Sequence, residues 1–159
     1  MLIALRAIHI LLGAFWAGTA IFFALYLEPS VRAAGQAGGA VMIQIMNRKY
    51  TQIIASAAGL TILSGFGLFR MDSIAAGPDW MHSRAAMSYS AGAAAAILAL
   101  ALGLTIIKPA GKRIVALMAA GNPPAAELNA LYDRAQLGGR LVGALVTVAV
   151  LAMAVARYL

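Results

Sequence analysis

Two histidines are the side chains in this sequence best suited to chemistry. His9 is followed at i+4 and i+8 by Gly13 and Ala17, so all three share one face if the segment is helical. Little bulk then stands beside the imidazole, which leaves a slot for a neighbouring helix or a flat ligand. A neutral imidazole in such a slot can ligate haem iron through one ring nitrogen while an acceptor holds the other. The alternative is a histidine that hydrogen-bonds a neighbouring helix and only specifies packing.

The second histidine lies in a methionine-rich segment. Thioether and imidazole ligands suit Cu(I), so this segment would make a chemically sensible copper site at an outer membrane edge. The alternative is a loop histidine among apolar fillers, because methionine commonly fills apolar space and the chain has 8 of them. The candidate copper ligands are His82, Met81, Met87 and Met71.

Other chemistries find no support in the residue types. The chain has no cysteine, which excludes a thiolate metal site or a catalytic thiol. No nucleophile stands beside a base, and no glycine loop or histidine spacing is typical of phosphate or zinc binding. No charged residue falls in the middle of an expected membrane span, which disfavours a proton-driven transporter. We therefore expect no hydrolytic enzyme.

Composition decides which solvent surrounds these residues. Of 159 residues, 63% are apolar without counting glycine and 11% are charged, against roughly 45–50% apolar with glycine and about 25% charged in soluble domains. A soluble domain of this size cannot bury so much apolar surface. The sequence therefore predicts a membrane protein in contact with lipid. It excludes a disordered chain, a disulfide-stapled secreted module and nucleic-acid binding as the main role.

Four apolar stretches are long enough to cross a bilayer, which takes about 20 residues. They cover residues 3–27, 51–69, 87–107 and 137–156. Because lipid offers no partner for peptide groups, each span must be a helix. The predicted fold is a single all-α domain, a bundle of four transmembrane helices.

The connections between these spans are expected to be partly helical. Asn122 and Pro123 are typical of a helix start, and the apolar spacing that follows predicts that the fourth helix protrudes from the membrane. Gly38 and Gly39 are expected to end one segment, after which an apolar stripe runs into the second span. Lys108 and the proline after it end or kink the third helix.

Basic residues predict the orientation. Eight Lys and Arg lie in the two long connections and four on the other side, which by the positive-inside rule places the connections in the cytoplasm and both termini outside. We expect the inner membrane of a bacterium. The eight are Arg32, Arg48, Lys49, Lys108, Lys112, Arg113, Arg134 and Arg140; the four are Arg6, Arg70, Arg84 and Arg157.

Small residues recur at helical spacing in three of the spans. Helices in a bilayer associate through close packing, because lipid tails are as apolar as leucine. The stripes therefore predict contacts within the bundle, with a homodimer interface as the alternative. They are Gly13, Ala17, Ala20 and Ala24; Ser88, Gly92, Ala96 and Gly103; and Gly139, Gly143 and Thr147.

The run from Ala7 to Gly18 resembles the first-helix signature of the copper-resistance D (CopD) family and its relatives, among them the HemJ-type protoporphyrinogen oxidases. The resemblance covers His9, Trp16 and Gly18, and more loosely Pro29. It implies that His9 ligates haem b or copper. The later spans lack the lysine and the further histidines of the HemJ-type enzymes, so that oxidase activity is not implied.

Two functions follow from these observations. In the first, His9 binds haem b or copper near the outer face, with Gly13 making room and Trp16 lining the pocket. In the second, the chain is a non-catalytic accessory or assembly subunit that binds no cofactor and uses its small-residue stripes in a homo-oligomer or a larger membrane complex.

Overall fold

The computed structural model describes residues 2–121 and 124–159, and these form helices joined by short turns, with no strand among them. Four helical rods make up the molecule. The first joins α1 (Leu2–Phe22), the π-helical turn η1 (Phe23–Leu27) and α2 (Glu28–Ala33), and the second is α4 (Tyr50–Ala76). The third joins α5 (Arg84–Leu102), the π-helical turn η3 (Gly103–Ile107) and α6 (Lys108–Ala119), and the fourth is α7 (Ala125–Ala156). The predicted all-α four-helix bundle is confirmed.

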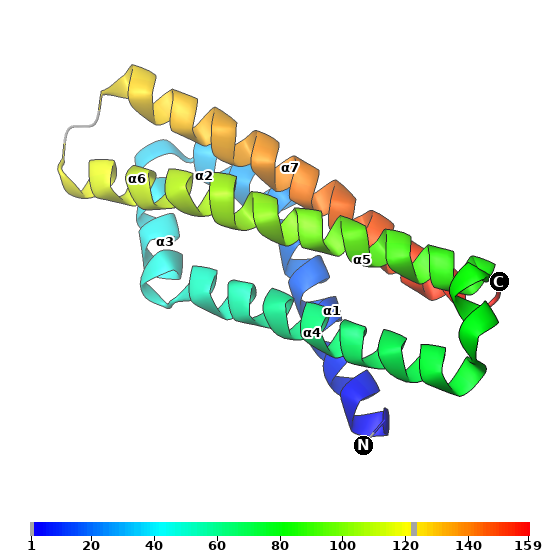
Figure 1. Ribbon diagram of the computed structural model, residues 1–159. Helices are drawn as coiled ribbons and strands as arrows, with labels where there is room; N and C mark the ends of the chain where they lie inside the picture. Colours follow the sequence, from blue (N-terminus) through cyan, green and yellow to red (C-terminus); the bar gives the residue numbers. More distant parts are fainter. Residues whose placement is uncertain (1, 122–123) are drawn as a thin grey trace.

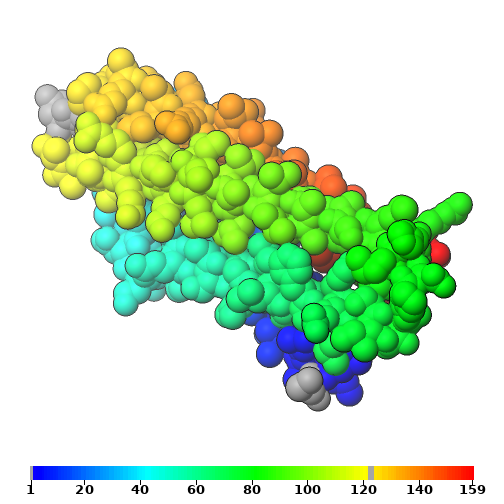
Figure 2. Space-filling model, in the orientation of Figure 1, coloured from blue at the N-terminus to red at the C-terminus, as the bar shows by residue number. Residues whose placement is uncertain are grey.

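Consecutive rods run in opposite directions, and α5 and α7 lie side by side over most of their length (Figure 1). The connections contain α3 (Gly35–Asn47) and a 3-10 turn, η2 (Pro78–His82). An ion pair of 3.5 Å between Arg6 and Asp72 places the start of α1 beside the end of α4. Figure 2 shows α5 and α6 covering one side of the molecule, with α4 beside them and the start of α1 projecting beyond.

The surface of the rods is suited to lipid. All four rods are long and apolar enough to cross a membrane. Large apolar side chains that point outward, among them Ile10, Phe66, Leu98 and Leu151, are more than half exposed. In water such a surface would be unfavourable, whereas lipid tails solvate it. These features fit the predicted multi-pass membrane protein.

The core is built almost entirely from small residues, as expected where helices approach closely in lipid. It consists of Trp16, Ala17, Ala58, Ala95, Ala96, Ala99, Val142, Val146 and Ala149. At the α5–α7 contact, a Cβ built on Gly92 would lie 3.2 Å from the carbonyl oxygen of Ala149, and the Ser88 hydroxyl donates to the carbonyl of Ala152 over 2.8 Å. The small-residue stripes therefore pack within one chain at these positions.

Two prolines shape the rods without ending them. Pro29 and Pro109 have no N–H to donate, and a proline ring clashes with the carbonyl four residues back. Each rod accommodates its proline with a π-helical turn just before it, in which the amides of Glu28 and Lys108 bond the carbonyl five residues back. The helices therefore continue past the predicted spans, from residues 27 and 107 to Ala33 and Ala119.

The connection between the first two rods differs from the expectation. Gly38 and Gly39 lie inside α3, and the chain instead turns at Gly35, whose φ of +56° favours glycine. The apolar stripe of α3 does not run into α4, because the chain breaks at Lys49 in the left-handed region. At the other connection α7 begins at Ala125, far before residue 137, as the predicted protrusion requires. The expected cap at Asn122 and Pro123 lies outside the described residues.

Gly38 is predicted to be essential for this corner. A Cβ built there would overlap the carbonyl oxygen of Val31, where the backbones of α2 and α3 touch. Gly38→Ala should therefore destabilise the protein by about 1–3 kcal/mol, as overpacking does. Thermal unfolding in detergent measures this, with Gly18→Ala as the control because nothing lies within 4 Å of that position. Equal melting temperatures for the two variants would contradict the close contact.

Candidate functional site

His9 lies between α1 and α4, where its ring is held by hydrogen bonds. Its Nδ1 is 2.8 Å from the carbonyl oxygen of Thr61 and 3.2 Å from the hydroxyl oxygen of Ser64. Because a carbonyl only accepts, Nδ1 carries the proton and donates to Thr61. The Ser64 hydroxyl donates to the α4 backbone. His9 therefore links α1 to α4 by a hydrogen bond, as expected for a histidine that specifies packing. In this tautomer Nε2 carries no proton.

The slot beside His9 is occupied by α4. A Cβ built on Gly13 would lie 3.3 Å from the Thr61 methyl group, and one built on Gly65 would lie 2.8 Å from Cε1 of His9. Of the two occupants that the sequence allowed, the structure places the neighbouring helix there. The Thr61 side chain therefore lies in the space beside Gly13.

The methionine-rich segment is spread over the surface. His82 ends η2, and its side chain is exposed, as are those of Met81 and Met87. Among the residues described, no three His, Cys, Asp or Glu side chains come together as a metal site would need. The neighbouring Trp80 packs its ring against Phe69 at 5.1 Å between centroids, which anchors η2 to α4.

A large cavity lies elsewhere, among the four rods. Its volume is about 730 Å³, within the usual range of ligand sites. Neither His9 nor Gly13 lines it, whereas Trp16 does. Four core residues, one from each rod, close its inner end: Trp16, Ala58, Ala99 and Val142.

The two ends of the cavity differ in polarity. From Trp16 to Glu28 the α1–η1 wall is about 18 Å long, at a helical rise of about 1.5 Å per residue. Its inner part is lined by small and apolar side chains, including those of Ala20, Ala55 and Leu100. Its outer part is lined by apolar side chains such as those of Val31, Met46 and Ile114 and, unlike the inner part, by the polar side chains of Glu28, Lys49, Tyr50, Thr51, Gln52, Lys108, Lys112, Tyr132 and Gln136.

The charges at the polar end are unusual for this chain. All three lysines of the sequence line the cavity, and none of its nine arginines does. None of the lysines forms an ion pair with any of the five acidic residues. A lysine ammonium is a compact charge that binds phosphate well. The lysines therefore leave positive charge available to a guest.

Glu28 is the one acidic residue among the side chains that line the cavity. Both of its carboxylate oxygens are buried from water and have no hydrogen-bonding partner among the described residues. The side chains of Gln136, Arg32 and Arg140 lie near it, and Arg32, one turn further on, forms its ion pair with Asp133 on α7 at 2.7 Å. A buried carboxylate without a close hydrogen-bonding partner is costly, which makes Glu28 a candidate for contact with a guest.

Glu28 and Lys108 owe their positions to the π-helical turns. Each residue directly follows a π-helical turn and precedes a proline. The same local structure in the two rods therefore brings residues of opposite charge to the cavity. π-helical turns are frequent at functional sites. From the sequence, Lys108 was expected only as a cytoplasmic basic residue at the end or kink of the third helix, and Glu28 was not singled out. The shared pattern of a charged residue before proline was the signal that could have identified them.

Two further small-residue positions belong to the cavity. Nothing lies within 4 Å of a Cβ built on Gly103 or Gly139, and both glycines line the cavity. By contrast, the Cβ built on Gly143 meets Ala24 at 3.4 Å, an ordinary packing contact. Some small residues of the predicted stripes therefore allow helices to pack closely, and others leave space within the cavity.

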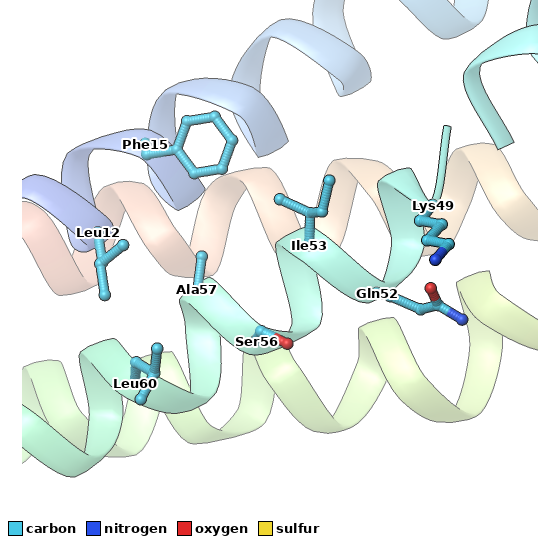
Figure 3. A pocket seen from close by; sticks show the side chains of 8 residues that line it. All are labelled: Leu12, Phe15, Lys49, Gln52, Ile53, Ser56, Ala57 and Leu60. Carbon is cyan, nitrogen blue, oxygen red and sulfur yellow. The ribbon is translucent and has the colours of Figure 1, made fainter. Parts of the chain in front are cut away.

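A second hollow is a shallow groove of about 350 Å³ on the outside of α1 and α4 (Figure 3). Leu12 and Leu60 lie at one end and Lys49 and Gln52 at the other. Phe15 lines it as well and is 47% exposed. The groove belongs to the apolar outer surface, and it has no buried polar group comparable to Glu28.

Comparison of the chain with protein-family models, curated proteins and solved structures found no match.

Proposed function

We propose that this protein is a membrane protein that binds a phospholipid in the cavity among its four rods. The observation that carries the proposal is the polarity of that cavity. Its inner end is apolar and closed by the core, and its outer end holds three lysines and an unpartnered carboxylate. A ligand that fits has an acyl tail for the inner part and an anionic head for the lysines.

The location of the cavity supports a lipid as the ligand. The helices that enclose it are those whose outer faces suit acyl chains, so a bilayer lipid is the most abundant amphiphile within reach. Positive charge next to a membrane attracts anionic head groups by about 1 kcal/mol per lysine. On the predicted topology the polar end faces the cytoplasm.

Replacing Lys108 tests the proposal. Lys108→Gln is expected to reduce the retention of phospholipid through purification by about fivefold, because one attraction of about 1 kcal/mol is lost. Mass spectrometry of the lipid extracted per mole of protein measures this. Arg134→Gln is the control, since it removes an exposed charge that does not line the cavity. Equal losses in the two variants, or no retained lipid in the unaltered protein, would refute the proposal.

The cofactor at His9 stays a prediction beside this one. The specific observation in its favour is that the Thr61 carbonyl holds Nδ1 and leaves Nε2 as an acceptor, the usual arrangement of a ligating histidine. The visible spectrum and metal content of the purified protein test it. Without a Soret band and without copper after expression with both supplied, His9 has the packing role only.

The accessory role expected from the sequence is compatible with lipid binding, because neither requires catalysis by this chain. A homo-oligomer or a larger complex is part of that proposal. Native mass measurement after gentle extraction tests it, and a single chain at every concentration would count against it.

A further inference from the structure

The unpartnered carboxylate of Glu28 has no role in binding an anionic head, and near a phosphate it would be repulsive. It nevertheless lies in the wall that carries the lysines. In a medium of low polarity a buried carboxylate needs a charged or hydrogen-bonding partner. Its oxygens accept no close hydrogen bond from the described residues, although Gln136, Arg32 and Arg140 lie near them, so a donor on the guest can complete their contacts.

The surrounding cations fill this role only at a distance, since Arg32 and Arg140 act on Glu28 without forming an ion pair with it. Arg32 is paired with Asp133, and none of the lysines in the wall forms an ion pair with Glu28. The neutral polar groups at this end are the side chains of Tyr50, Thr51, Gln52, Tyr132 and Gln136. The polar end therefore offers separate positive and negative charges, which complement a guest that carries both.

We infer that the guest is an aminophospholipid, whose head joins an anionic phosphate to a primary ammonium. This rests on the proposed function and specifies its ligand. The lysines receive the phosphate, the Glu28 carboxylate accepts hydrogen bonds from the ammonium, and an acyl tail follows the apolar wall toward Trp16. A choline head offers no N–H donor, and a glycerol head has no positive charge. Both should therefore bind less well than an ethanolamine head.

Competition among defined lipids tests the inference. The full chain is exchanged into mixed micelles that contain equal amounts of dioleoyl phosphatidylethanolamine, phosphatidylglycerol and phosphatidylcholine, and native mass spectrometry identifies the bound lipid. We expect phosphatidylethanolamine to be bound at least about fivefold more often than either competitor. Glu28→Gln should remove this preference while lipid binding persists, because the lysines remain. Asp72→Asn is the matched control, since that carboxylate pairs with Arg6 and does not line the cavity.

The outcomes separate this inference from the proposed function. If all three lipids bind without preference, the inference of an aminophospholipid is wrong, but the proposal that the cavity binds lipid stands. The same holds if the preference for phosphatidylethanolamine survives Glu28→Gln. Absence of any bound lipid overturns both. The comparison of phosphatidylethanolamine with phosphatidylcholine uses the unaltered protein, so it tests the aminophospholipid inference even if Glu28→Gln does not fold.

Discussion

Gly139→Phe is expected to reduce retained phospholipid at least tenfold, equivalent to about 1.4 kcal/mol of binding free energy. The position lines the cavity, and a Cβ there meets nothing within 4 Å, so the new ring has room and the fold has little to lose. The ring would occupy the space assigned to the acyl tail. Lipid extracted per mole of purified protein measures the loss.

Gly18→Phe is the matched control for this substitution. It introduces the same ring at an exposed glycine that does not line the cavity and also has nothing within 4 Å. Its lipid content should equal that of the unaltered protein. If Gly139→Phe retains as much lipid as Gly18→Phe, the cavity is not the binding site.

Trp16→Ala should cost about 3–5 kcal/mol of stability, the usual range for removing a buried large aromatic side chain. Trp16 is only 5% exposed and is the largest residue of an otherwise small-residue core. Its ring also closes the inner end of the cavity, so its loss joins two empty spaces. Unfolding in detergent, followed by circular dichroism, measures the change.

Phe15→Ala provides the comparison for Trp16. It removes an aromatic ring from the neighbouring position of α1, where the side chain is 47% exposed on the lipid-suited surface. We expect a loss of less than about 1 kcal/mol. Similar losses for the two variants would contradict the placement of Trp16 in the core.

The rods could be predicted from the sequence because lipid imposes a simple rule. An apolar run of about 20 residues must be helical, so the number of helices and their order follow from composition alone. Their ends did not follow. The spans were expected to stop at residues 27 and 107, whereas both helices continue through π-helical turns to Ala33 and Ala119.

The candidate site was harder to predict, because it depends on which helix faces meet. The spacing of His9 and Gly13 correctly indicated a bare face but did not say what fills it, and α4 fills it. Trp16 was expected to line a pocket, and it does line one, yet that cavity includes neither His9 nor Gly13. The lysines lie in separate connections of the sequence, and only the folding of the four rods around one cavity brings them to its wall.

The central claim is that the cavity holds one phospholipid, and native mass spectrometry of the unaltered protein tests it most directly. After extraction in mild detergent and removal of excess lipid, we predict a species with the mass of one chain plus one phospholipid, or the corresponding multiple for an oligomer. Collisional activation should release that lipid intact. A spectrum that contains only the bare chain at the lowest activation energy would contradict the account.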